Sequence, residues 1–133
     1  MRVAASLRYA LYGTMGLLLA SGLAWLAVRA GSTATWSMRI HGATAMALLA
    51  LGGGAVALHV KDAWRERKNR LSGLALAGSL LVLAVTGYLL YYVGDDEARG
   101  LVSALHWILG IAAAAVLAWH ALVAQRLSGA RVD

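Results

Sequence analysis

Residues 100–125 read GLVSALHWILGIAAAAVLAWHALVAQ and contain no charged side chain. About 20 helical residues cross the roughly 30 Å hydrocarbon core of a bilayer, so this stretch is long enough to span it. Three further stretches without Asp, Glu, Lys or Arg are residues 9–28, 40–60 and 71–94. Lipid offers the backbone no hydrogen-bond partners, and a helix satisfies its own. The sequence predicts an all-α integral membrane four-helix bundle with up-down-up-down topology.

The composition agrees with this fold class. Of 133 residues, 61% are hydrophobic and only 14% are charged, whereas a soluble domain carries about 25% charged residues. We expect one transmembrane domain over residues 1–133. The first apolar stretch follows Arg2 and Arg8, as a signal peptide would, but signal h-regions run about 7–15 residues, so we interpret it as a helix. The expected helices cover about 9–29, 37–60, 71–93 and 100–125.

The basic residues are divided unequally between the two ends of these helices. One side receives Arg2, Arg8, Lys61, Arg65, Arg67, Lys68, Arg70, Arg126 and Arg131, and the other receives Arg29, Arg39 and Arg99. By the positive-inside rule, the N- and C-termini and the loop KDAWRERKNR (61–70) are cytoplasmic. The short loops near residue 31 and at GDDEARG (94–100) then face outward. This orientation favours a bacterial inner (cytoplasmic) membrane location.

The net charge of +6 also bears on partners. It is spread over three juxtamembrane segments, so membrane lipids with anionic headgroups account for it better than nucleic acid does. The absence of Cys excludes CxxCH haem attachment, Cys-ligated iron–sulfur clusters and disulfides. The absence of Asp and Glu from the four apolar stretches disfavours a carboxylate proton relay or cation antiporter.

Four histidines lie inside two of the predicted helices: His41 and His59 in the second, His106 and His120 in the fourth. At 3.6 residues per turn, the 18-residue step between the first two closes five turns, and the 14-residue step between the others closes four turns to within about 40°. Each helix therefore carries both imidazoles on one face. The two helices run in the same direction in an alternating topology, which places one histidine from each near either membrane surface.

Haem iron in electron-transfer proteins takes two axial ligands from opposite sides of the ring, and helices of a bundle can supply them. The pattern predicts two haem b groups with iron ligated by His41 and His106 (outer) and by His59 and His120 (inner). The pairs would be about 27 Å apart along the second helix and about 21 Å along the fourth. Interfacial or packing histidines are the alternative, and zinc or copper would need three or four converging ligands.

Nearby residues fit a haem but also have ordinary explanations. Gly52 and Gly110 fall on the histidine-bearing faces, where small residues would admit a flat macrocycle or simply allow close helix packing. Arg39, Lys61 and Arg126 are candidate partners for haem propionates, or basic residues that snorkel to the membrane surface.

Three stretches carry a resemblance: SMRIHGATAMALLALGGGAVALHVK (37–61), RLSGLALAGSLLVLAVTGYLLYY (70–92) and ALHWILGIAAAAVLAWHALVAQR (104–126). Together they resemble the four-helix dihaem cytochrome b superfamily, which includes bacterial cytochrome b561-like proteins and membrane cytochrome b subunits of periplasmic redox enzymes. The resemblance implies two haems b on the four histidines and electron transfer across the bilayer between the quinone pool and a periplasmic redox protein or enzyme subunit. The chain departs from that pattern in having no fifth apolar stretch and no extended soluble region, which leaves its donor and acceptor open.

No catalytic acid or base is assigned, and an electron-transfer subunit is favoured over a complete enzyme. Two alternatives stay open: a stand-alone quinol- or superoxide-reactive oxidoreductase, and a haem-free membrane anchor subunit. The acidic run at 95–97 could dock a basic partner by charge complementarity. A quinone site would need polar, protonatable groups near one haem. The candidates, which would otherwise be ordinary solvated loop residues, are Asp62, Glu66, Asp95, Asp96 and Glu97.

Overall fold

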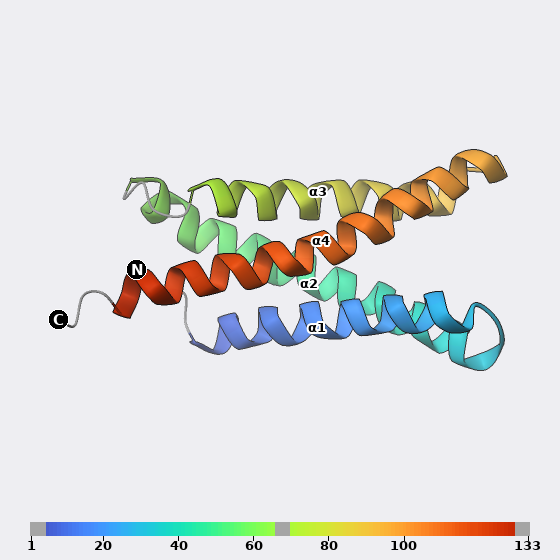
Figure 1. Cartoon of the computed structure of the whole chain (residues 1–133), viewed down its shortest axis with the longest axis horizontal. Coiled ribbons are helices and arrows are strands. Elements are labelled where there is room, and N and C mark those ends of the chain that lie inside the picture. Colours follow the sequence, from blue (N-terminus) through green and yellow to red (C-terminus); the bar gives the residue numbers. More distant parts are fainter. Residues whose placement is uncertain (1–4, 66–69, 130–133) are drawn as a thin grey trace. The chain divides into compact units, whose positions relative to one another are not determined.

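The computed structural model describes the backbone of residues 5–65 and 70–129, and the side chains of 5–57 and 70–123. These residues form four helices: α1 (Ala5–Val28), α2 (Gly31–Arg65), α3 (Arg70–Tyr92) and α4 (Asp96–Gly129) (Figure 1). Each contains a segment long and apolar enough to cross a membrane: Ala5–Val28, Gly31–Ala57, Arg70–Tyr92 and Asp96–Val123. The prediction of an all-helical chain with four candidate spans is confirmed, and it indicates an integral membrane protein.

Two helices extend well beyond their predicted bounds. α2 begins at Gly31 instead of residue 37 and continues to Arg65, and α4 begins at Asp96 instead of residue 100 and continues to Gly129. The predicted bounds followed the charged residues, which mark where hydrocarbon ends. A helix stops where its backbone hydrogen bonds or caps stop, so it can continue into the headgroup region. The expected loops at 61–70 and 94–100 are therefore helical over residues 61–65 and 96–100.

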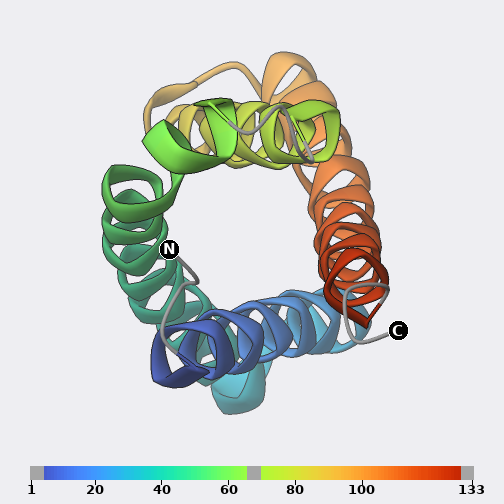
Figure 2. The same ribbon diagram turned by 90° about the vertical axis from the view of Figure 1, so that its left-hand side faces the viewer.

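The chain divides into two compact units, Met1–Arg67 and Lys68–Asp133. Within the first, α1 and α2 lie side by side with opposite chain direction, and α3 and α4 do the same within the second (Figures 1 and 2). Each unit is thus an antiparallel helical hairpin. The turns are short, because only residues 29–30 separate α1 from α2 and only residues 93–95 separate α3 from α4.

The α1–α2 turn depends on two residues with left-handed backbone. Arg29 has φ 54° and Gly31 has φ 79°. The Arg29 amide donates to the Trp25 carbonyl at 2.9 Å, and the Arg29 guanidinium Nε donates to the Leu26 carbonyl at 3.2 Å. These bonds satisfy carbonyls that the end of α1 would otherwise leave unpaired.

The α3–α4 turn is closed by a cap and by an arginine. The Asp95 carboxylate accepts from the Ala98 amide at 2.8 Å, which makes Asp95 the N-cap of α4. Asp96 and Glu97 occupy the first turn of the helix, where its dipole favours negative charge. The Arg99 guanidinium donates twice to the Val93 carbonyl, at 3.0 and 2.8 Å. All three acidic residues of this segment therefore lie where the helix dipole favours them.

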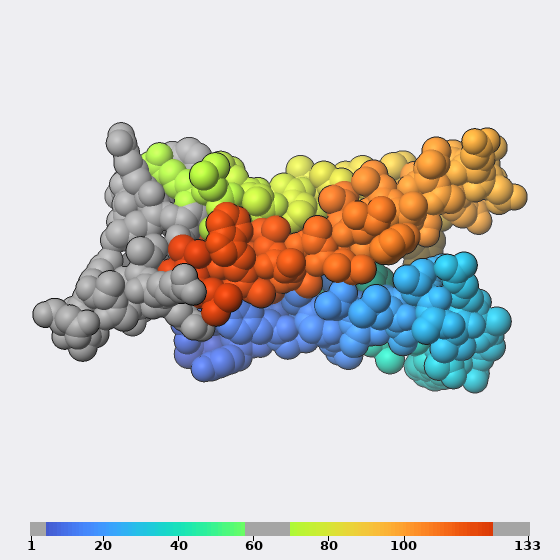
Figure 3. All heavy atoms as spheres, viewed as in Figure 1, coloured from blue at the N-terminus to red at the C-terminus, as the bar shows by residue number. Residues whose placement is uncertain are grey.

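Small and hydroxyl-bearing residues dominate the buried positions, while large apolar side chains face outward. Figure 3 shows the atoms of α1 (blue) and of the beginning of α2 (cyan) as a continuous surface at the turn end of the first hairpin. Small residues let helices approach closely in a membrane. Large apolar side chains gain little by burial there, because the lipid tails around them are equally apolar. The buried residues among those described are Met15, Ser21, Ala34, Ser37, Thr44, Leu48, Ser72, Thr86 and Ala113.

Candidate functional site

His41 lies on α2 with its ring against α1. Its Nδ1 is 3.0 Å from the Leu18 carbonyl oxygen and 3.4 Å from Ser21 Oγ. Because a carbonyl oxygen only accepts, Nδ1 must carry the proton and donate. This hydrogen bond selects the tautomer whose lone pair is on Nε2, which is the nitrogen that a metal would bind.

Gly22 makes room for this ring. A Cβ atom at this position would lie 3.1 Å from His41 Cε1 and 3.2 Å from His41 Nδ1. Both distances are shorter than ordinary van der Waals contact between heavy atoms. Glycine therefore allows the imidazole to lie against the α1 backbone, within reach of the Leu18 carbonyl.

His106 is held in the same manner within the second hairpin. Its Nδ1 is 2.8 Å from Thr86 Oγ1 on α3. That hydroxyl donates to the Val82 carbonyl at 2.8 Å, with the Leu83 carbonyl at 3.2 Å. A hydroxyl has one proton, and here it is directed to the backbone, so Thr86 Oγ1 accepts from Nδ1–H. His106 thus has the same tautomer as His41, and a Cβ at Gly87 would lie 3.4 Å from its Cε1.

His120 pairs with another hydroxyl group on α3, that of Ser72. Its Nδ1 is 2.8 Å from Ser72 Oγ, and Ser72 is only 4% exposed. The residue after Ser72 is again a glycine. A Cβ at Gly73 would lie 4.0 Å from His120 Cε1. The fourth predicted ligand, His59, belongs to α2, but its side chain lies outside the described residues.

The three described histidines therefore share one arrangement. Each ring packs beside a hydroxyl–glycine pair on the preceding helix: Ser21-Gly22, Ser72-Gly73 and Thr86-Gly87. Sequence reasoning missed these supporting residues. The signal was an internal repeat, because LLASG (18–22) and LAVTG (83–87) each place a hydroxyl residue 20 positions before a histidine.

The two candidate packing glycines differ from each other. A Cβ at Gly110 would lie 3.9 Å from Leu83 Cδ2, an ordinary contact between α4 and α3. Helix packing within the second hairpin therefore explains that glycine. At Gly52 a Cβ would meet no atom of the described residues within 4 Å, so packing against them does not require a glycine there.

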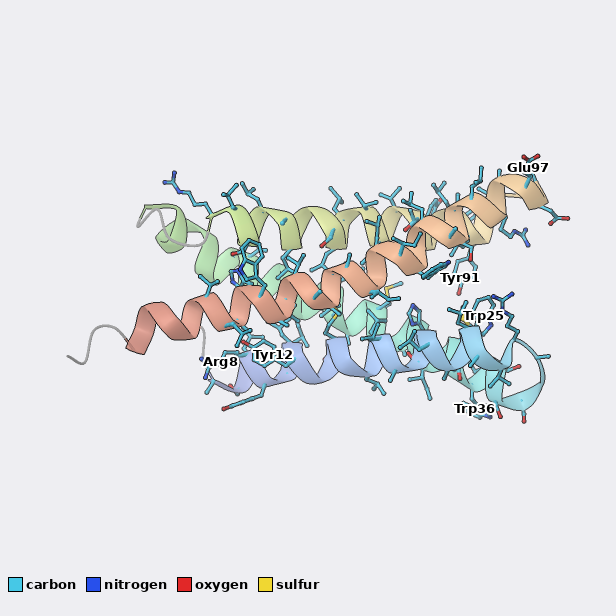
Figure 4. The ribbon with its side chains drawn as sticks, in the orientation of Figure 1. Arg8, Tyr12, Trp25, Trp36, Tyr91 and Glu97 are labelled. Carbon is cyan, nitrogen blue, oxygen red and sulfur yellow. The ribbon has the colours of Figure 1, made fainter. Side chains whose placement is uncertain are left out.

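The candidate propionate partners are only partly described. The Arg39 guanidinium lies over the Trp36 ring, 5.1 Å from its centroid, as a cation–π pair at the protein surface. Figure 4 labels Trp36 and Trp25 at the turn end of the first hairpin and Arg8 and Tyr12 at the opposite end of α1. The side chains of Lys61 and Arg126 lie outside the described residues.

The acidic residues do not form a metal site in the part of the chain that is described. No group of three or more His, Cys, Asp or Glu side chains gathers there to hold a metal ion. Asp95 is engaged as the α4 cap, whereas Asp96 and Glu97 are exposed, and Figure 4 shows Glu97 at the start of α4. The side chains of Asp62 and Glu66 fall outside the described residues.

Comparison of the chain with protein-family models, with curated proteins and with solved structures found no match.

Proposed function

We propose that the chain is a dihaem b-type membrane cytochrome that transfers electrons across the bilayer between the quinone pool and a periplasmic redox partner. His41 and His106 would ligate the outer haem and His59 and His120 the inner haem. The proposal includes a four-helix bundle in a bacterial inner membrane with both termini cytoplasmic. The observation that supports it best is the shared hydrogen bonding of Nδ1 in the three described histidines.

Metal-ligating histidines almost always donate their second ring nitrogen to an acceptor, which fixes the tautomer and increases ligand basicity. His41 and His106 donate Nδ1–H to the Leu18 carbonyl and to Thr86 Oγ1, which puts the lone pair of each ring on Nε2, the tautomer that ligates a metal. An ionisable residue within a membrane helix is costly and is a functional candidate by default. Three such residues with the same support favour ligation over incidental packing.

The chain's own residues would bind, orient and insulate the cofactor. A bound haem b supplies a one-electron redox couple. The imidazoles hold it, the hydroxyl and carbonyl acceptors orient the imidazoles, and the apolar helices exclude water, which also affects the redox potential. Arg39 remains a candidate for a propionate, since an arginine forms strong paired hydrogen bonds with carboxylates.

An electron-transfer subunit fits the fold better than a complete enzyme. The links between α1 and α2 and between α3 and α4 contain only residues 29–30 and 93–95. These two turns leave few groups to build a substrate site at this end of either hairpin, and in this proposal a partner supplies that site. If a quinol analogue fully reduces the purified protein without any added protein, while no periplasmic partner can be found, the stand-alone alternative is favoured.

Haem stoichiometry combined with single His→Ala replacements tests the proposal. The purified wild-type protein is expected to hold two haems b per chain, measured from the absorption spectrum of the reduced protein. His41→Ala and His106→Ala should each lose one haem, and His59→Ala and His120→Ala should each lose the other. Thr14→Val is a suitable control, because Thr14 bonds only to the Ala10 carbonyl of its own helix among the described residues. A colourless wild-type protein that does not take up added haem would exclude the proposal and favour a membrane anchor.

A further inference from the structure

We infer that Thr86 is a positioning residue for His106 and that Ser72 is the equivalent residue for His120, whereas the Leu18 carbonyl orients His41 and Ser21 adds only a longer contact. This inference rests on the proposed function, because it concerns residues that orient the haem ligands. None of these hydroxyls contacts the cofactor in this scheme. Each acts through the imidazole that it hydrogen-bonds.

The hydroxyls of Thr86 and Ser21 are acceptors by elimination. Thr86 Oγ1 directs its proton to the Val82 carbonyl at 2.8 Å, and Ser21 Oγ directs its proton to the Leu18 carbonyl at 3.0 Å. Their remaining hydrogen-bonding capacity is that of an acceptor, which matches a donating Nδ1–H. The two residues are 4% and 6% exposed, so solvent has little access to replace them.

The same register occurs in both hairpins. Ser21 and Thr86 each precede their histidine by 20 residues, and each is followed by a glycine that admits the ring. His41 and His106 each stand ten residues after the first residue of their helix, Gly31 and Asp96. The outer ligands are therefore equivalent members of an internal repeat, with a hydroxyl residue and a glycine at equivalent positions.

The distances predict a graded effect. The Thr86–His106 and Ser72–His120 pairs are 2.8 Å apart, whereas Ser21 is 3.4 Å from His41 Nδ1, which also has the Leu18 carbonyl at 3.0 Å. Removing the Thr86 hydroxyl takes away an acceptor at 2.8 Å, whereas removing the Ser21 hydroxyl takes away one at 3.4 Å and leaves the Leu18 carbonyl at 3.0 Å. Thr86→Val should therefore perturb its haem much more than Ser21→Ala.

The direction of the effect follows from ligand chemistry. Loss of the group that hydrogen-bonds a metal-ligating histidine typically costs about 10–100-fold in metal affinity. We expect a loss of that order in haem affinity for Thr86→Val. A less basic imidazole stabilises the oxidised iron less, so the midpoint potential of the haem that remains bound should rise. Thr86→Ser keeps the acceptor and should restore both quantities towards the wild-type values.

The experiment compares full-length wild type, Thr86→Val, Thr86→Ser, Ser21→Ala and Ser72→Ala in detergent. Ser79→Ala on α3 is the matched control, since the Ser79 hydroxyl bonds only to the Leu76 carbonyl of its own helix among the described residues. The readouts are haem affinity by titration, midpoint potential by redox titration, and the electron paramagnetic resonance signal of the oxidised iron. Circular dichroism checks that each variant is folded.

The expected result is a weakened haem with a raised potential and an altered resonance signal in Thr86→Val, rescue by Thr86→Ser, and little change in Ser21→Ala and Ser79→Ala. If Thr86→Val does not fold, Ser72→Ala must show the same changes at the other haem. If the wild type binds haem and both Thr86→Val and Ser72→Ala behave like Ser79→Ala, the positioning role alone is overturned. A wild type that binds no haem would instead remove the proposed function.

Discussion

A methyl group on Gly22 would lie 3.1 Å from Cε1 of His41, on the neighbouring helix of the same hairpin. The ring is held there by the hydrogen bond from Nδ1 to the Leu18 carbonyl at 3.0 Å. An added methyl and this hydrogen bond therefore compete for the position of the imidazole. Either the ring moves away from α1 or the two helices separate slightly.

Gly22→Ala should weaken binding of the outer haem, because displacement of the ring breaks the Leu18 hydrogen bond. Overpacking of this kind costs about 1–3 kcal/mol of stability. Gly16→Ala on the same helix is the control, since a Cβ there would meet no described atom within 4 Å. That change should be neutral or stabilise α1 by up to about 1 kcal/mol. Haem content and thermal unfolding in detergent measure both effects, and equal behaviour of the two variants would contradict the prediction.

Asp95→Ala should destabilise the second hairpin by about 1 kcal/mol, because it removes the acceptor for the Ala98 amide at the start of α4. Asp95→Asn should lose less, since an asparagine side chain also caps helices well. Thermal unfolding midpoints of the two variants in the same detergent provide the measurement. An alanine variant as stable as the asparagine variant would show that the cap contributes little.

Asp96→Asn combined with Glu97→Gln tests the docking of a basic partner, because these two carboxylates are exposed at the outer end of α4 in the proposed orientation. The reduction rate with the partner should fall and lose most of its dependence on salt. Stability should change by no more than about 0.3–1 kcal/mol per residue, the usual effect of a charge near a helix terminus. A rate that is unchanged and independent of salt would exclude this surface as the docking site.

Gly31→Ala should destabilise the first hairpin by about 1–2 kcal/mol, because the residue has φ 79° and a Cβ is disfavoured there. Gly42→Ala in the same helix should have the opposite sign, since no described atom lies within 4 Å of a Cβ at that position. Chemical or thermal unfolding of the two variants gives the comparison. A Gly31→Ala protein that is more stable than wild type would show that the turn adopts another backbone conformation.

The sequence was sufficient for the helical class and for the four apolar spans, because the charge-free stretches decide them. It was insufficient for the ends of α2 and α4, since a charged residue such as Asp96 lies outside the apolar stretch but still belongs to the helix. The bundle arrangement, the orientation, the histidine pairs and the electron-transfer role stay predictions.

The hydroxyl supports could not have been found from periodicity alone. A serine or threonine in an apolar helix can satisfy itself on its own backbone, as Thr14 and Ser79 do. Thr86 makes the same local bond and also reaches His106. Only the pairing of α3 with α4 distinguishes these cases, and a single sequence does not state the register of that pairing.

The two-residue connection at Arg29 and Ala30 fixes how α2 is aligned along α1 in the first hairpin. An inserted residue that is taken into the start of α2 would rotate the rest of that helix by about 100° and shift it by about 1.5 Å relative to α1, which would turn His41 away from the Leu18 carbonyl. Surface connections usually tolerate insertions and deletions well. Here the connection should be among the least tolerant segments of the chain, because its length sets the direction in which a half-buried imidazole points.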